Sequence, residues 1–342
     1  MNLRSYRDLV EYFKSHDRTS IVDAHQAKVH SVVWNSDGGR LASGSFDKTV
    51  CVFNLDNGCK LVREQTFRGH TDQVDQVSWH QSHSDLLASA GGDMTVRVWD
   101  ARSHKCAATV NTKGENINIA WSPDGNTIGV GNKDDLISFI ETRNYKIIAS
   151  EQFKVETNEF SWDKSNHFFF LTNGIGQIIV LKWPELENVV TLQAHPSNII
   201  CIEFDRTGQY FAVGSTDALV SLWDTRHLTC LRTFDSMLTA NVTSCYEVFI
   251  FRLDWPVRAV SFSNDSTMLA SGSEDLCIDV AYIETGEKVC EVKCESPTFT
   301  VAWQPQSYLL AYACDDKVSN AYGHAEREAG TIKLFGLTAD QA

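Results

Sequence analysis

The sequence predicts an all-β protein, a seven-bladed β-propeller with a short N-terminal helix. A strand-like segment that ends in a core aromatic residue recurs seven times, at Trp34, Trp79, Trp121, Trp162, Phe204, Phe262 and Trp303. Successive aromatics are 41–45 residues apart, except for one interval of 58. A period of about 40–45 residues with four short strands per unit is typical of a β-propeller. Seven such units use nearly all of the 342 residues, which favours a single closed domain.

The second repeat shows the order of elements in each unit. Gly69-His70 opens the repeat, and a tight turn at Gly91-Gly92-Asp93 separates its second and third strands. The four strands are expected at residues 74–79, 86–90, 95–100 and 105–110. Period-two alternation bounded by Gly, Asp and Ser indicates strands joined in hairpins. The pattern resembles the WD40 repeat family over about residues 19–337, with full Trp-Asp endings at Trp99-Asp100 and Trp223-Asp224.

The WD40 resemblance implies a buried, hydrogen-bonded set of a His, a Ser or Thr, an Asp and the Trp. The matching residues are His70, Ser89, Asp93 and Trp99 in the second repeat, His25, Ser43 and Asp47 in the first, and His195, Asp217 and Trp223 in the fifth. Phe53 replaces the Trp of the first repeat, and Val213 replaces the Ser of the fifth. Because such a set satisfies polar groups in a tight turn, a structural role is expected rather than a catalytic one.

The ends of the chain are expected to complete the last blade. Only five residues, 338–342, follow Leu337, which is too few for a fourth strand, so this segment is expected to be a tail. The extended run 19–24 has no blade of its own and is expected to supply the missing strand. Residues 1–18 are expected to form a helix, because Leu3, Tyr6, Val10 and Phe13 fall on one helical face. A helix packed on the propeller, a partner-binding helix and a frayed tail are the alternatives.

Two connections are longer than the repeat requires. The interval of 58 residues contains an insert at residues 236–251, and removing its 16 residues restores a spacing of 42. The last repeat has a long connection at residues 317–329. In the WD40 family both belong to loop classes on the face of the propeller that carries the His and Asp residues.

The composition indicates a globular protein and no metal or cofactor. The chain is 43% hydrophobic and 22% charged, and no run approaches the roughly 18 apolar residues of a membrane span. The N-terminal residues carry too many charges for a secretory signal. Ten cysteines are interpreted as small core residues in a reducing compartment. Cys290 and Cys294 are close in sequence, but no second pair at zinc spacing accompanies them.

The net charge of −14 is unevenly placed. Residues 1–120 contain fourteen Lys or Arg and fourteen Asp or Glu, whereas residues 121–342 contain sixteen and thirty. A phosphate backbone would be repelled by the later blades. The charge distribution therefore favours a protein partner over a nucleic acid.

The sequence contains no recognisable catalytic motif, so no enzyme activity is expected. It has no P-loop, no G-x-S-x-G and no H-E-x-x-H, and its Gly-rich stretches recur at the blade period, which indicates turns. Two Trp-Asp-x-Arg strings, ending in Arg102 and Arg226, are similar to strings in propellers that dock on cullin-ring ubiquitin-ligase adaptors. Arg102 and Arg226 are therefore candidate adaptor contacts, and a substrate receptor of such a ligase is an alternative function.

Longer strings are more specific than the repeat. They occupy residues 111–135, 194–224, 252–263, 294–303 and 327–337. Together they resemble the family formed by the third subunits of the THO complex, part of the transcription–export (TREX) machinery, and the resemblance runs through all seven repeats. The insert departs from that family, in which the chain passes directly from the outer strand to the next blade. A genuine insert and a splicing or gene-model artefact both fit this departure.

The THO resemblance implies a non-catalytic scaffold subunit of a nuclear complex that couples transcription and processing to mRNA export. It implies contacts with the other, large helical THO subunits, and with an mRNA-export helicase and an RNA-binding adaptor through the complex. RNA contact is expected to be indirect, and no membrane contact is expected. A direct RNA-binding propeller is a second alternative.

Overall fold

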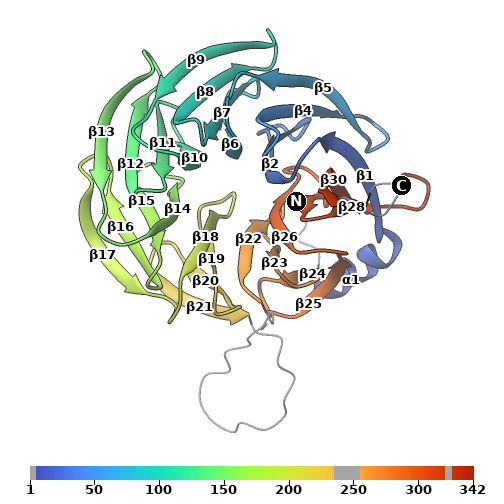
Figure 1. The fold of residues 1–342 in the computed structure, drawn as a ribbon. Helices are drawn as coiled ribbons and strands as arrows, with labels where there is room; N and C mark the ends of the chain where they lie inside the picture. The colour runs from blue at the N-terminus through green and yellow to red at the C-terminus, as the bar shows by residue number, and fades with distance from the viewer. Residues whose placement is uncertain (1–4, 235–254, 320–325) are drawn as a thin grey trace, which may run out of the picture. The chain divides into compact units, whose positions relative to one another are not determined.

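The computed structural model describes residues 5–234, 255–319 and 326–342. In these residues the strands form seven four-stranded sheets and one two-stranded hairpin, accompanied by one short helix (Figure 1). Each four-stranded sheet is one blade, so the predicted seven-bladed β-propeller with a short N-terminal helix is confirmed. The chain divides into two compact units, residues 12–157 with 299–342 and residues 1–11 with 158–298, which are described in turn.

The first of these units contains blades 1, 2, 3 and 7. Blade 1 consists of β2 (Val29–Trp34), β3 (Arg40–Ser45), β4 (Thr49–Leu55) and β5 (Leu61–Arg68). Blade 2 consists of β6 (Val74–Trp79), β7 (Leu86–Gly91), β8 (Thr95–Asp100) and β9 (Lys105–Asn111). Blade 3 consists of β10 (Asn116–Trp121), β11 (Thr127–Asn132), β12 (Leu136–Glu141) and β13 (Lys146–Gln152). Blade 7 consists of β26 (Thr298–Trp303), β27 (Leu310–Cys314), β30 (Gly330–Leu337) and β1 (Arg18–His25).

The other unit contains blades 4, 5 and 6. Blade 4 consists of β14 (Thr157–Trp162), β15 (Phe168–Asn173), β16 (Gln177–Lys182) and β17 (Glu187–Gln193). Blade 5 consists of β18 (Ile199–Phe204), β19 (Tyr210–Ser215), β20 (Val220–Asp224) and β21 (Thr229–Phe234). Blade 6 consists of β22 (Val257–Phe262), β23 (Met268–Ser273), β24 (Cys277–Tyr282) and β25 (Lys288–Lys293).

The position of a strand within its blade determines its residue pattern. In blade 2, β6 alternates between buried and partly exposed residues, whereas β7 is buried along almost its whole length. The last strand, β9, is mostly exposed. A strand covered on both faces needs a run of small and apolar residues, which LLASAG in β7 provides. The outer strand can carry polar residues because one of its faces meets water.

Blade 7 is built from both ends of the chain. β30 pairs with β1 on one side and with β27 on the other (Figure 1). Ile21 lies opposite Lys333 in the first pairing, and Leu310 lies opposite Phe335 in the second. The N-terminal strand expected at residues 19–24 therefore occurs as β1, which covers the edge of β30 that would otherwise be unpaired.

The helix α1 (Tyr6–Ser15) begins at a reciprocal cap. The backbone N–H of Ser5 donates to the Asp8 carboxylate, and the N–H of Asp8 donates to the Ser5 hydroxyl. Leu9 and Phe13 are the buried residues of the helix, at 0% and 3% exposure. The Phe13 ring stacks on the ring of Phe335 with centroids 5.8 Å apart. The helix therefore packs through Leu9 and Phe13, while Leu3 of the expected apolar face lies outside the described residues.

Tryptophans at the ends of the first strands join neighbouring blades of the first unit. Each indole N–H donates to a backbone carbonyl in the first strand of an adjoining blade. The bonds run from Trp34 to Ala302 (3.1 Å), from Trp79 to Val33 (3.0 Å) and from Trp121 to Ser78 (3.0 Å). The aromatic that defines the sequence repeat is therefore also a hydrogen-bonded link between blades.

The two long connections differ in what the structure describes. The insert at residues 236–251 lies outside the described residues. In the connection at residues 317–329, β28 (Lys317–Ser319) and β29 (Glu326–Glu328) form a hairpin. Among the helices of the described residues, none has the length and apolarity needed to span a membrane.

Candidate functional site

His70 is the centre of a hydrogen-bonded set in blade 2. Its Nδ1 lies 2.9 Å from Asp93 Oδ1, and its Nε2 lies 2.7 Å from Ser89 Oγ. The indole N–H of Trp99 donates to the same hydroxyl at 2.9 Å. β7 positions Ser89, β8 positions Trp99, and Asp93 stands in the turn between these strands. The structure therefore brings the four residues named from the sequence into one connected set.

His25 holds the corresponding position in blade 1. Its Nε2 lies 2.8 Å from Ser43 Oγ, and its Nδ1 lies 3.1 Å from Asp47 Oδ2. Phe53 stands where blade 2 has tryptophan, so no indole reaches the Ser43 hydroxyl. The thiol of Cys51 lies 3.9 Å from His25 Nδ1, the ring nitrogen on the Asp47 side.

The set in blade 5 is complete, although Val213 stands at the position where blades 1 and 2 have a serine. His195 Nδ1 lies 2.9 Å from Asp217 Oδ2, and His195 Nε2 lies 2.8 Å from Ser221 Oγ. The Trp223 indole N–H donates to Ser221 Oγ at 2.8 Å. Ser221 is directly opposite Val213 in the pairing of β19 with β20. Val213 does stand where blade 2 has Ser89, and the neighbouring strand supplies the hydroxyl of this set as Ser221.

The sequence contained a signal for Ser221 that the family pattern did not use. Ser221 precedes Trp223 by two residues in a strand, so both side chains point to the same face of the sheet. A hydroxyl at that position can reach the histidine from the opposite strand of the hairpin.

The histidines of these sets are buried, and the pKa values of two of them are shifted in opposite directions. Burial opposes protonation of His25, but the Asp47 carboxylate and Cys51 outweigh burial and raise its pKa to about 9. Burial outweighs Asp93 and lowers the pKa of His70, with a further contribution from the positive charge of Arg97. The side chains of His25, His70 and His195 are 0%, 1% and 2% exposed. Groups this buried connect turn to strand and offer no surface to a substrate.

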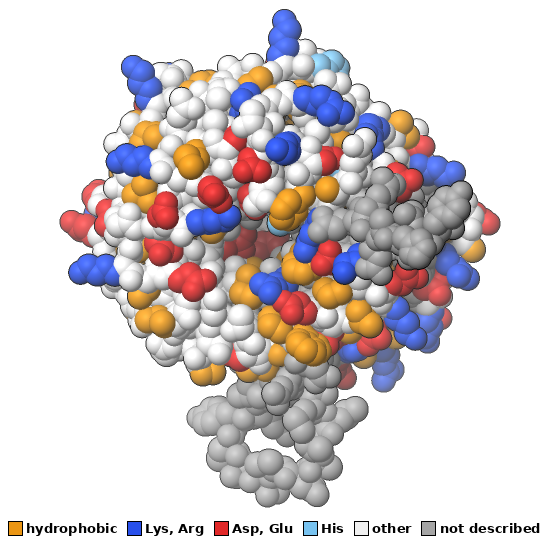
Figure 2. Space-filling view, in the orientation of Figure 1, with side chains coloured by type: hydrophobic (Ala, Val, Ile, Leu, Met, Phe, Trp, Pro, Cys, Tyr) orange, Lys and Arg blue, Asp and Glu red, His pale blue; other side chains and the backbone are white. Residues whose placement is uncertain are grey.

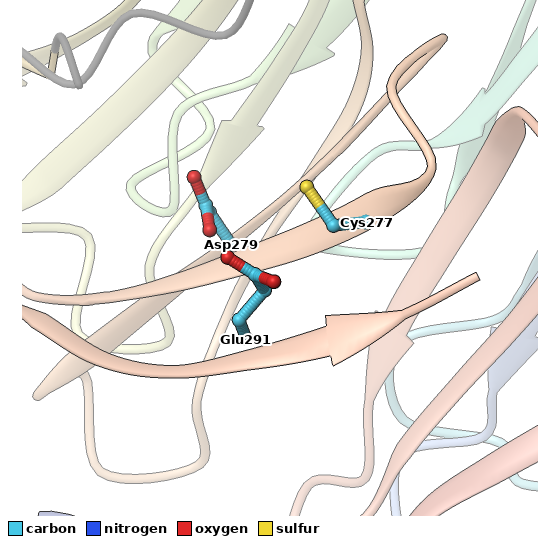
Figure 3. Close-up of side chains that lie close together, drawn as sticks. All are labelled: Cys277, Asp279 and Glu291. Atoms are coloured by element: carbon cyan, nitrogen blue, oxygen red, sulfur yellow. The ribbon is translucent and has the colours of Figure 1, made fainter.

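Blade 6 contains a cluster that the sequence did not reveal. The ligand atoms of Cys277, Asp279 and Glu291, from β24 and β25, lie within 4.8 Å of one another (Figure 3). The Lys288 ammonium is 2.6 Å from Asp279 and 2.8 Å from Glu291, so a protein cation already balances the carboxylates. Burial and the neighbouring Asp279 and Glu291 carboxylates raise the pKa of the Cys277 thiol to about 12. The arrangement is that of an ion pair rather than a metal centre.

The two Trp-Asp-x-Arg arginines are exposed. Neither the Arg102 guanidinium nor that of Arg226 has a hydrogen-bond or ion-pair partner among the residues that the structure describes. Their surroundings differ, because Arg226 lines a groove of about 1020 Å³ in blades 4 and 5, whereas Arg102 stands in blade 2. The groove is the candidate binding site of this part of the chain.

Comparison with known proteins places the chain in a family. A family model described as the THOC3 beta-propeller domain matches residues 25–313. The chain belongs to the THOC3 β-propeller family. The resemblance seen in the sequence strings is thereby confirmed, and the matched residues run from the His25 set of blade 1 into blade 7.

Relatives with a curated description agree with this assignment. THO complex subunit 3 of Arabidopsis thaliana is 44% identical over 314 residues, which are 92% of this chain and 93% of that protein. WD repeat-containing protein AAC3 of Dictyostelium discoideum is 31% identical over 96% of this chain and 69% of its own length. Protein FIZZY-RELATED 2 of Arabidopsis thaliana is 26% identical over 60% of this chain and 43% of its own length. The similarity to THO complex subunit 3 extends over nearly the whole of both chains, whereas that to Protein FIZZY-RELATED 2 covers less than half of that protein.

Membership of the THOC3 family and the propeller fold both point to a non-catalytic protein. The buried sets of blades 1, 2 and 5 agree with this, because their polar atoms bind one another. The exposed turns, in contrast to these buried sets, carry side chains that a partner can reach.

Proposed function

We propose that this THOC3-family chain is a non-catalytic scaffold subunit of a nuclear THO-type complex that couples transcription and mRNA processing to mRNA export. The observation that carries the proposal is its 44% identity to THO complex subunit 3 over 92% of the chain. Similarity over nearly the whole length includes the turns and outer strands of the blades as well as their cores. Surfaces that hold partner subunits therefore fall within the region of similarity.

The partners proposed are the large helical subunits of the complex. An mRNA-export helicase and an RNA-binding adaptor are reached through the complex, and RNA is contacted indirectly. The net charge of −14 supports this, because an acidic protein repels a phosphate backbone. On the face drawn in Figure 2, Lys and Arg side chains are interspersed with Asp and Glu side chains.

Affinity purification tests the assembly. The tagged full chain is purified from nuclear extract, and the bound proteins are identified by mass spectrometry. Large helical THO subunits are expected, and their capture by the Arg102→Glu variant should be unchanged. Recovery of a cullin adaptor without THO subunits would support the ligase alternative and contradict the proposal.

Two further measurements test the location and the relation to RNA. A fluorescent fusion is expected in the nucleus, and depletion of the chain is expected to retain polyadenylated RNA there until the full chain is restored. Ultraviolet crosslinking of the isolated chain to RNA at physiological salt is expected to give little product. Strong crosslinking of the isolated chain would indicate a direct RNA-binding propeller.

A further inference from the structure

We propose that the groove in blades 4 and 5 binds a peptide segment of another subunit, in which an acidic side chain stands next to a bulky apolar side chain. The proposal rests on the function proposed above, and adds the place of contact and the chemistry of the partner. Three features of the groove support it, namely its shape, its apolar lining and the exposed guanidinium of Arg226.

Three turns and one outer strand form the groove. The turns follow β14, β18 and β20, and the outer strand is β17. These turns lie at the strand ends opposite to the turn that holds Asp217, so the groove is separate from the His195 set. Its volume of about 1020 Å³ reaches the upper end of the roughly 300–1,000 Å³ typical of ligand pockets. A groove of this size admits several side chains of a peptide.

The floor of the groove is apolar and partly exposed. Phe168 is 37% exposed and Val189 is 52% exposed, whereas Phe170 and Val180 beneath them are buried. Leu228 continues the apolar surface from the turn after β20. An aromatic and an aliphatic side chain exposed together in a concave site can bury the bulky apolar side chain of a partner.

The carboxylates of the groove already have partners. Asp163 accepts hydrogen bonds from the backbone N–H groups of Ser165 (3.1 Å), His167 (2.9 Å) and Phe168 (2.7 Å). Asp224 accepts from the backbone N–H of His227 at 2.6 Å, and the ring Nδ1 of His227 lies 2.9 Å away. Both acids therefore hold their own turns in shape.

Arg226 is the arginine among the residues that line the groove. Lys164 lines it too, and burial lowers the pKa of this lysine while Glu203 and Asp205 oppose that shift. Within the described residues, the Arg226 guanidinium has neither a hydrogen-bond nor an ion-pair partner. A guanidinium presents a planar pair of donors that fits a carboxylate, and arginine is enriched in the energetically dominant parts of interfaces. An Asp or Glu beside the apolar anchor of a partner peptide is therefore the complement of this groove.

The same observations favour a peptide over RNA. A nucleic acid that enters a groove needs several cations along its phosphates. Here only Arg226 and Lys164 stand beside the carboxylates of Asp163 and Asp224, so a single carboxylate with an apolar neighbour is a better match than a phosphate backbone.

A photo-crosslinker in the groove tests the proposal in the assembled complex. Phe168 is replaced by benzoylphenylalanine, which keeps an aromatic ring at this site, and the crosslinked peptide is identified by mass spectrometry. The control carries the same crosslinker at Ile148, a 57% exposed residue of β13 in another blade. A crosslink from position 168 is expected in another subunit, within a few residues of an Asp or Glu that adjoins a bulky apolar residue. Position 148 should not give that peptide.

The charge of Arg226 is tested with a matched pair of variants. Arg226→Glu is expected to lower the yield of the position 168 crosslink by at least about tenfold, as for an interface arginine that contributes strongly. Arg102→Glu makes the same change at the equivalent exposed position of blade 2 and should leave the yield unchanged. Reversing the charge of the acidic residue found in the crosslinked peptide should restore binding to the Arg226→Glu variant.

The outcomes separate this inference from the proposed function. If the complex assembles but position 168 crosslinks to no subunit, to a second copy or to RNA, the inference is overturned and the function stands. Equal yields for the Arg226→Glu and Arg102→Glu variants also overturn it. If no other subunit purifies with the wild-type chain, the proposed function fails and the inference fails with it.

Discussion

Moving the serine hydroxyl of the blade 5 set from position 221 to position 213 should change the stability of the protein in a predictable way. Ser221→Ala should destabilise the protein, and Val213→Ser should cost less in that variant than in the wild type. The reason is that Val213 occupies the position in β19 that Ser89 occupies in β7, directly opposite Ser221. A hydroxyl at either position can approach the histidine of its blade.

The expected magnitude follows from the bonds of Ser221. Its hydroxyl bonds both His195 Nε2 and Trp223 Nε1, each at 2.8 Å, so Ser221→Ala leaves two buried polar groups without a partner. With about 1–3 kcal/mol for each such group, the loss is about 2–6 kcal/mol. Val213→Ser alone should cost about 1–2 kcal/mol, because it removes buried methyl groups at a fully buried position. The double variant should be more stable than the sum of the singles by about 1–2 kcal/mol.

Thermal unfolding of the four proteins measures this coupling. An unfolding entropy of about 2.1 cal/mol/K per residue converts 3 kcal/mol into about 4 °C for a chain of 342 residues. The Ser221→Ala variant should therefore melt about 4 °C below the wild type, and the double variant between these two or close to the Ser221→Ala value. Additive losses in the double variant would refute the reasoning that the two strands offer interchangeable hydroxyls.

Three further predictions concern the ends of the chain, the insert and pH. Deletion of residues 1–24 should lower the melting temperature more than deletion of residues 1–17, because it also removes β1 and exposes the edge of β30; equal melting temperatures would contradict this. Deletion of residues 236–251 should preserve or raise the melting temperature, because β21 and β22 find their partners within blades 5 and 6; unfolding of these blades would contradict it. The raised pKa of His25 contributes stability that is complete below about pH 6.5 and is lost as the pH rises to about 9. The melting temperature should therefore fall between these pH values, and Asp47→Asn should make this fall smaller.

Much of the fold follows from the period of the sequence. The repeated aromatics fix the number of blades, because each unit needs the same four strands to bury its faces. The last repeat has only three strands of its own, and a blade with an unpaired edge would be open to other strands. The run at residues 19–24 is therefore identified as the fourth strand. The structure gives that strand as Arg18–His25, one residue longer at each end.

The sites are harder to read from sequence because they depend on strand register. The family pattern assigns the hydroxyl of each set to one strand, and it therefore missed Ser221, which reaches the same histidine from the neighbouring strand. The cluster of Asp279, Lys288 and Glu291 forms only when β24 and β25 are paired in their observed register. The groove combines turns that are up to about sixty residues apart in the chain, and no local pattern indicates their meeting.

The distribution of paired and unpaired charges in one turn supports the proposal that this propeller binds its partners through its turns. Asp224 and Arg226 are two residues apart in one turn, yet the carboxylate is bound to His227 and the guanidinium has no such partner in the described residues. The carboxylate stabilises the turn, because it accepts hydrogen bonds that the backbone would otherwise leave unmade. The arginine adds little to folding at an exposed position, where even a formed ion pair contributes about 0–1 kcal/mol. The guanidinium can contribute more to the free energy of binding once a partner shields it from water. The apolar residues beside it supply the buried area that stabilises the complex.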